Sequence, residues 1–135
     1  MTDATKTMKL NHMSFPSADT PATAQFFAKY LGFTIAGEWG GSYILKRSGF
    51  DVVIDKVTDH LPAWPGNFHV GFELPDADAV RALYDRFKAD GVQLETEVFN
   101  HDRGSRFFCR APGGVMFELN TRADAAPEYQ GTFDS

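Results

Sequence analysis

Residues 12–19 read HMSFPSAD and residues 69–76 read HVGFELPD. In both stretches an Asp follows a His by seven residues, and the second copy begins 57 residues after the first (69 − 12). A helix-like segment follows each Asp and ends at a glycine, Gly32 in the first copy and Gly91 in the second. The shared order of strand, Asp, helix and Gly predicts a duplicated module.

An amphipathic helix is expected after each repeated Asp. In the first helix, Asp19 or Thr20 can cap the free N–H groups and Pro21 suits the first turn. The second helix is expected at about 76–90, where apolar side chains recur at helical spacing. The apolar stripes comprise Ala24, Phe27 and Leu31 in the first helix and Val80, Leu83, Tyr84 and Phe87 in the second.

Most of the remaining chain reads as short strands. They are expected at 8–15, 42–47 and 50–57 in the first half and at 66–74, 93–98, 105–110 and 114–120 in the second. We therefore predict an α+β fold with modules at 8–57 and 67–121, each a strand, a helix and about three strands. A linker at 58–66 contains two prolines, and tails lie at 1–7 and 122–135. The C-terminal tail lacks periodicity and is expected to be either mobile or packed on a partner.

Composition narrows the functional class. The chain has 135 residues, with 13 Lys and Arg against 18 Asp and Glu, a formal net charge of −5 (13 − 18). An acidic chain without a basic block is not expected to bind nucleic acid or an anionic membrane. No stretch reaches the ~18 apolar residues of a membrane span, and Cys109 has no second cysteine to pair with. We expect a soluble, cytoplasmic protein whose 13 Phe build a core or cavity of aromatic rings.

Three residues are candidate metal ligands. His12 and His69 occupy the same position in the first strand of each half, and Glu118 lies in the last strand of the second. If the strand faces that carry them line one cavity, two imidazoles and one carboxylate form a facial triad with open coordination positions. The alternative for each residue is a surface or hydrogen-bonded side chain with no ligand role.

The chain resembles the vicinal oxygen chelate superfamily, which includes glyoxalase I, extradiol dioxygenases and the bleomycin and fosfomycin resistance proteins. In the first half the matching motif comprises His12, Asp19, Phe26-Phe27 and Leu31-Gly32-Phe33. In the second half it is the stretch 107–119, FFCRAPGGVMFEL, which ends in Glu118-Leu119. The resemblance covers about residues 8–121, and the family hosts many chemistries on one fold.

The resemblance implies two tandem βαβββ modules that form a cupped, incomplete mixed β-barrel with the helices outside. It also implies a homodimer and a divalent metal, Fe, Mn, Ni or Zn, held by His12, His69 and Glu118. The expected function is that of a metal-dependent lyase or dioxygenase acting on a small oxygen-rich substrate. The alternative is a metal-free protein that sequesters a ligand, as the bleomycin-resistance members do.

Two positions depart from the family pattern. Glyoxalase-like members usually carry a fourth ligand in the first half, but aligning 49–53 with 114–118 puts Val53 there. A two-residue slip would offer Asp51 or Asp55 instead. Many members also carry a Tyr where this chain has Phe108, which has no proton to give.

Further candidates concern the substrate. Contacts are expected from Trp39, Arg106, Phe108 and Arg110. An inward Arg could clamp a carboxylate or phosphonate, although an Arg at a cavity rim or beside a nearby acid is the common case. Glu73 shares the strand face of His69 and is the candidate general base, with a surface ion pair as its alternative.

Overall fold

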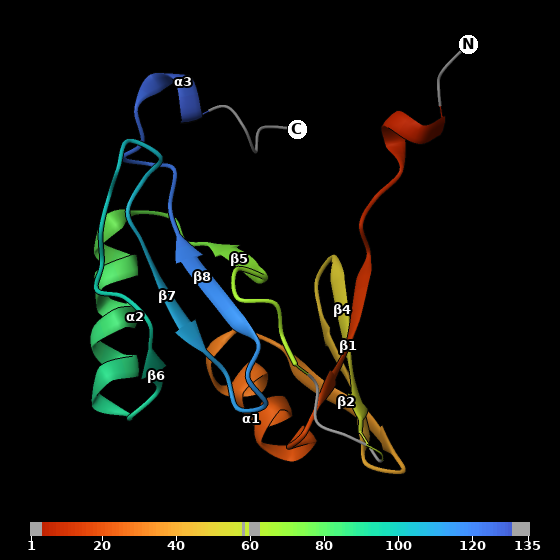
Figure 1. Ribbon diagram of the computed structural model, residues 1–135. Helices are drawn as coiled ribbons and strands as arrows, with labels where there is room; N and C mark the ends of the chain where they lie inside the picture. The colour runs from red at the N-terminus through yellow and green to blue at the C-terminus, as the bar shows by residue number, and fades with distance from the viewer. Residues whose placement is uncertain (1–3, 58, 60–62, 131–135) are drawn as a thin grey trace. The chain divides into compact units, whose positions relative to one another are not determined.

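The fold consists of two βαβββ modules, which confirms the predicted fold class (Figure 1). A computed structural model describes residues 4–57, 59 and 63–130. The chain divides into two compact units, Met1–Ala63 and Trp64–Ser135. Unit 1 contains a 3₁₀ turn (Ala4–Thr7), β1 (His12–Ser17), α1 (Thr20–Tyr30), β2 (Thr34–Trp39), β3 (Ser42–Arg47) and β4 (Phe50–Lys56). Unit 2 contains β5 (His69–Glu73), α2 (Ala77–Ala89), β6 (Gln93–Leu94), β7 (Arg106–Arg110), β8 (Met116–Asn120) and α3 (Pro127–Gln130).

The two sheets repeat the same strand order and register. Their orders are β1-β4-β3-β2 and β5-β8-β7-β6, with β1–β4 and β5–β8 as the parallel pairs. The partners in these pairs are His12–Asp51 and Ser14–Val53 in unit 1, and His69–Met116 and Gly71–Glu118 in unit 2. His12 therefore corresponds to His69, and Val53 corresponds to Glu118. The duplication read from the sequence extends to individual strand partners.

Both main helices begin at the repeated Asp. The carboxylate of Asp19 accepts a hydrogen bond from the N–H of Ala22 at 3.1 Å, and that of Asp76 accepts one from Ala79 at 2.8 Å. Thr20, the other cap candidate, lies inside α1 and donates its hydroxyl to the carbonyl of Gly41. An Asp at this position satisfies a free N–H and favours the positive end of the helix. No helix in the described ranges is long and apolar enough to cross a membrane.

Aromatic rings fill the space between each helix and its sheet. In unit 1 the ring of Phe27 lies 5.9 Å from that of Phe15 and 5.3 Å from that of Phe33. In unit 2 the ring of Phe107 lies 5.7 Å from that of Phe87 in an edge-to-face contact. These rings are almost completely buried. The prediction that the Phe residues build a core is confirmed, and their rings pack against one face of each sheet.

The strand boundaries differ most from the sequence expectation at β1, β2 and β6. Residues 34–39 form β2, which the sequence pattern did not assign. A bulge between Ile35 and Gly37 interrupts its alternation, and the Trp39 ring occupies the space where Gly37 lacks a Cβ. The pairing of β6 covers only Gln93–Leu94, and beyond it the hydroxyl of Thr96 accepts a hydrogen bond from the N–H of Phe108. The segment 8–11 precedes β1 instead of extending it.

The C-terminal segment packs on its own chain. The N–H of Ala126 donates to the carbonyl of Asp102 at 2.7 Å, and the carboxylate of Asp124 accepts hydrogen bonds from the N–H and hydroxyl of Ser105. Partial burial opposes ionisation of Asp124, but these bonds and the charge of Arg81 lower its pKa. These bonds hold residues 122–130 against the chain's own loop, so this part of the tail is not mobile, and its packing on a partner stays a prediction. Bonds between such distant residues leave no periodic signal in the sequence. Residues 131–135 lie outside the described part of the chain.

Candidate functional site

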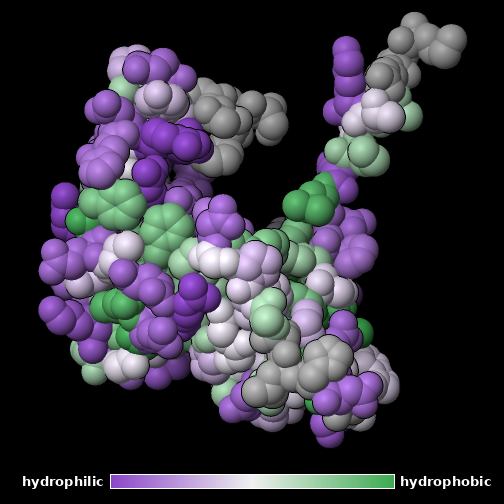
Figure 2. Space-filling model, in the orientation of Figure 1, coloured by the Kyte–Doolittle hydropathy of each residue, from purple (hydrophilic) through white to green (hydrophobic). Residues whose placement is uncertain are grey.

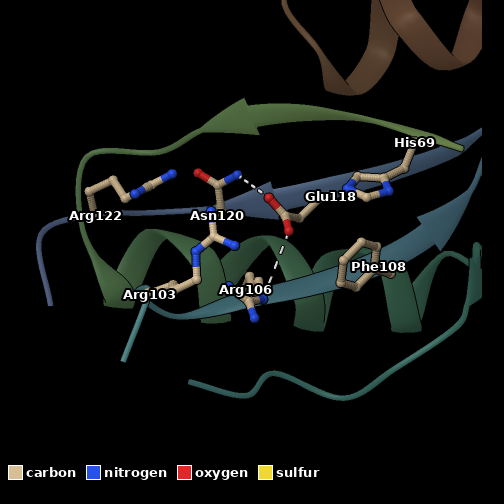
Figure 3. Close-up of a pocket in the computed structure, with 7 residues that line it drawn as sticks. All are labelled: His69, Arg103, Arg106, Phe108, Glu118, Asn120 and Arg122. Carbon is tan, nitrogen blue, oxygen red and sulfur yellow. Dashed lines mark hydrogen bonds and ion pairs between the residues drawn. The ribbon is translucent and has the colours of Figure 1, made fainter. Parts of the chain in front are cut away.

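A pocket lies on the face of the unit 2 sheet that α2 leaves open (Figure 3). Side chains alternate along a strand, so Phe107, Cys109, Phe117 and Leu119 are buried on the helix side, and the residues between them face away. The pocket has a volume of about 310 Å³. It is lined by His69, Arg103, Arg106, Phe108, Glu118, Asn120 and Arg122.

Glu118 is held by two neighbours in this pocket. The amide nitrogen Nδ2 of Asn120 donates to Oε2 of Glu118 at 2.6 Å, and Nε of Arg106 lies 3.8 Å from Oε1. Gly71, the strand partner of Glu118, adds no side chain: a Cβ there would lie 3.5 Å from Oε2. The glycine therefore leaves one side of the carboxylate open between two strands.

His69 presents one ring nitrogen for a ligand. Its Nδ1 lies 2.8 Å from the backbone carbonyl oxygen of Asn67. A carbonyl oxygen only accepts, so Nδ1 carries the proton and the neutral ring keeps its lone pair on Nε2. The centroids of the His69 and Phe108 rings lie 5.1 Å apart, and the two rings are nearly perpendicular, at 85°. Metal-ligating histidines in proteins are commonly oriented by this kind of second hydrogen bond.

His12 in unit 1 has the same internal arrangement. Its Nδ1 lies 2.7 Å from Oδ1 of Asn11, an amide oxygen that only accepts, so its lone pair is also on Nε2. Its strand partner Asp51 lies 3.6 Å from Nζ of Lys46. The register places Val53, without the two-residue slip, at the position that Glu118 holds in unit 2.

The structure brings together two of the three candidate metal ligands. His69 and Glu118 line one pocket of unit 2, whereas His12 belongs to unit 1. Among the described residues, no group of three or more His, Cys, Asp and Glu side chains could hold a metal ion. The donor types nevertheless fit a divalent ion, because imidazole nitrogen and carboxylate oxygen suit Fe, Mn, Ni and Zn. The three-ligand site stays a prediction.

The candidate substrate residues fall into two groups. Arg106 and Phe108 line the pocket. Arg110 instead donates to Oε1 of Glu95 at 2.7 Å and to the carbonyl of Gly114 at 2.8 Å, which is the paired role that competed with substrate contact. Glu73 is exposed at the end of β5, opposite Asn120. Trp39 lies in unit 1, 63% exposed, with its ring over Gly37.

Sequence reasoning missed three pocket residues, Arg103, Asn120 and Arg122. The two arginines lie outside regular strands, Arg103 in the loop before β7 and Arg122 just after β8. The alternation of a strand assigns faces only within that strand, so it places neither side chain. Asn120 was detectable, because it shares the strand face of Glu118 two residues away.

Comparisons with known proteins agree with this architecture. The sequence profile of the Glyoxalase/Bleomycin resistance protein/Dioxygenase superfamily matches residues 9–119. A possible glyoxalase from Bacillus cereus is 30% identical, with a TM-score of 0.73, and the match covers 84% of this chain and 98% of that one. The chain therefore belongs to the glyoxalase/bleomycin resistance protein/dioxygenase superfamily, which confirms the resemblance seen in the sequence.

More distant structures share the fold. A lactoylglutathione lyase from Agrobacterium tumefaciens is 15% identical, with a TM-score of 0.67, covering 83% of this chain and 92% of that one. A genomically encoded fosfomycin resistance protein from Listeria monocytogenes is 18% identical, with a TM-score of 0.73, and the match covers 91% of this chain and 98% of that one. No curated protein matches the sequence. Because the fold hosts different chemistries, activity has to be argued from the pocket.

Proposed function

We propose that the protein is a metal-dependent enzyme of this superfamily, in which His12, His69 and Glu118 hold a divalent ion. The observation that carries the proposal is the shared state of the two histidines. Each has its Nδ1 bonded to an oxygen acceptor and its Nε2 lone pair available, at equivalent register positions of the two modules. Fe, Mn, Ni and Zn all accept two imidazoles and one carboxylate.

The proposed substrate is a small oxygen-rich molecule bound in the pocket of unit 2, and the reaction is that of a lyase or a dioxygenase. A bound divalent ion would supply Lewis-acid stabilisation of negative charge on the substrate oxygens. Phe108 provides an apolar wall and no proton, so proton transfer needs another group. Glu73 is the proposed general base, since it is a carboxylate on the same strand as His69.

Metal analysis tests the proposal. Protein purified without chelator is expected to hold about one Fe, Mn, Ni or Zn ion per chain. His69→Ala and Glu118→Gln should lower the affinity for Zn²⁺ by at least tenfold, because each removes a ligand. His101→Ala is the matched control, since His101 is an exposed histidine in the loop before β7 and does not line the pocket. Zn²⁺ affinities unchanged by both ligand substitutions would contradict the proposal.

A metal-free binding protein is the second candidate, and one observation favours it. The Glu118 carboxylate already accepts a hydrogen bond from Asn120 and lies beside Arg106, so it has partners without an ion. In that case metal-free protein would bind bleomycin, with quenching of the tryptophan fluorescence. The arginines of the pocket disfavour a cationic ligand there. Quenching at micromolar bleomycin, together with no metal uptake, would favour this function over the enzyme.

A further inference from the structure

We propose that Arg103, Arg106 and Arg122 form an oxyanion subsite, and that the substrate is a small hydroxy acid whose carboxylate or phosphonate binds there. This substrate class rests on the proposed function, because it concerns the same pocket. Figure 3 shows Arg103 and Arg122 toward the end of the pocket away from His69 and Phe108, with Glu118 between. The anionic group of the substrate would therefore bind at the end of the pocket that Arg103 and Arg122 line. The reacting oxygens of the substrate would lie near Glu118 and His69.

The charge of the pocket is opposite to that of the chain. Three guanidinium groups and one carboxylate line it, which gives a formal charge of +2 (3 − 1) with His69 neutral. The chain as a whole carries −5. A concave site lined by one sign of charge focuses the field and raises the local concentration of oppositely charged molecules. This pocket would therefore select anions.

Arg106 has donor capacity that the protein does not use. Its Nε is buried and has no hydrogen-bond partner within the described residues, since Glu118 Oε1 lies 3.8 Å away. The guanidinium lies over the ring of Phe99, 4.9 Å from its centroid. A buried unpaired donor is uncommon, and the flat guanidinium fork matches a carboxylate or phosphonate. An oxyanion would satisfy it.

Arg103 and Arg122 are positioned by the C-terminal segment. The Nη1 of Arg122 donates to the carbonyl of Tyr129 at 2.8 Å, and the guanidinium of Arg103 lies 5.8 Å from the centre of the Tyr129 ring. The bonds from Asp124 to Ser105 and from Ala126 to Asp102 tie this segment to the loop that carries Arg103. These contacts orient the two guanidinium groups before an anion binds, which lowers the entropy that they lose on binding.

Asn120 adds an acceptor to the subsite. Its Nδ2 is engaged by Glu118, while its Oδ1 is buried and has no hydrogen-bond partner in the part of the chain that the structure describes. An amide oxygen requires a donor, which an oxyanion does not supply. A hydroxyl group beside the anion would supply it, and this is why the ligand is assigned as a hydroxy acid.

Binding of small anions to the metal-free protein tests this assignment. Chelator-treated and dialysed protein is titrated with glycolate, acetate, hydroxymethylphosphonate and methylphosphonate, and amide NMR shifts report binding. We expect each hydroxy acid to bind more tightly than its partner without the hydroxyl. The tighter of the two hydroxy acids identifies the carboxylate or the phosphonate as the anionic group. Arg103→Gln and Arg122→Gln should weaken binding about tenfold, since each removes a charge-assisted hydrogen bond.

Arg86→Gln on α2 is the matched control, because it removes the same charge at an exposed helix position outside the pocket. It should leave the affinities unchanged. Arg122→Lys keeps the charge without the fork and should give an intermediate loss. The proposal is overturned if none of the four anions binds, if Arg103→Gln and Arg122→Gln bind like the wild type, or if the hydroxyl makes no difference. Since no metal is present, these results stand apart from the metal titration that tests the proposed function.

Discussion

At the scale of single residues, strand alternation explains why one face of β7 and β8 lines the pocket and the other face is buried under α2. Glu118 faces the pocket, and its chain neighbours Phe117 and Leu119 are buried under α2. The same alternation buries Cys109 completely while Phe108 lines the pocket. The thiol is therefore a core group without a place in the proposed chemistry.

Burial of Cys109 predicts a loss of stability at alkaline pH. Desolvation, with a smaller contribution from the charge of Glu95, raises the pKa of the thiol from 9.0 to about 12. Above pH 9.0 the unfolded chain releases this proton while the folded chain keeps it, so the free energy of unfolding falls as pH rises. The slope reaches at most about 1.4 kcal/mol per pH unit for one proton.

Urea denaturation at about pH 8 and about pH 10.5 measures this effect. Tyr and Lys side chains also titrate in that range, so the same measurement is made on Cys109→Ala. In this variant the free energy of unfolding should fall by about 1–2 kcal/mol less than in the wild type. Equal falls in the two proteins would show that the thiol ionises without unfolding.

At the scale of elements, the loop 100–105 and the segment after β8 support the pocket jointly. Gly104 lies where they meet, with a φ of +101°. A Cβ at this position would lie 1.8 Å from the carbonyl oxygen of Thr121, which is backbone and cannot turn aside. Only glycine fits, for reasons of both space and conformation.

Gly104→Ala should therefore destabilise unit 2 strongly. We expect a loss of about 2–4 kcal/mol in the free energy of unfolding, from the clash and the strained φ together. Gly66→Ala is the control, because no atom lies within 4 Å of its Cβ position and its φ is not in the left-handed region. Thermal unfolding followed by circular dichroism measures both variants. A Tm of Gly104→Ala equal to that of the control would mean that the loop moves aside without cost.

Elements with regular periodicity were predictable, and contacts between distant segments were not. The repeated His and Asp residues predicted β1, β5 and the starts of both main helices, with Asp19 or Thr20 as the first cap, because capping and alternation act over a few residues. β2 escaped prediction because Gly37 and its bulge break the alternation. For the site, Glu118 was predicted, and strand parity places Asn120 on the same face. Arg103 and Arg122 were not predictable, because the loops that carry them are positioned by hydrogen bonds between residues more than ten positions apart in the sequence.

At the scale of the whole molecule, the extended segment before β1 exposes apolar side chains. Figure 2 shows hydrophobic residues (green) on it, and Met8 is 76% and Leu10 80% exposed. Contact with another molecule would remove the apolar surface of these two side chains from water. A second copy of the chain is the proposed partner.

We predict a homodimer with a mass of about 30 kDa (2 × 15.0 kDa) in sedimentation equilibrium. A double substitution, Met8→Asp with Leu10→Asp, should shift the mass toward that of one chain, because it puts two charges into the apolar contact. Lys6→Asp and Lys9→Asp together serve as the control, since they alter charge in the same segment without removing apolar area. A wild-type mass of one chain would rule out the dimer, and a dimer that survives the double substitution would place its interface elsewhere.

The two tryptophans give each unit its own optical reporter. Trp39 lies over Gly37 in unit 1, and Trp64 stacks on Phe68 in unit 2 with ring centroids 5.3 Å apart. Replacing either one with Phe leaves a single tryptophan, so excitation selective for tryptophan follows the unfolding of each half separately. The repeated module, with one tryptophan in each copy, thus allows the cooperativity between the two halves to be measured from two emission spectra.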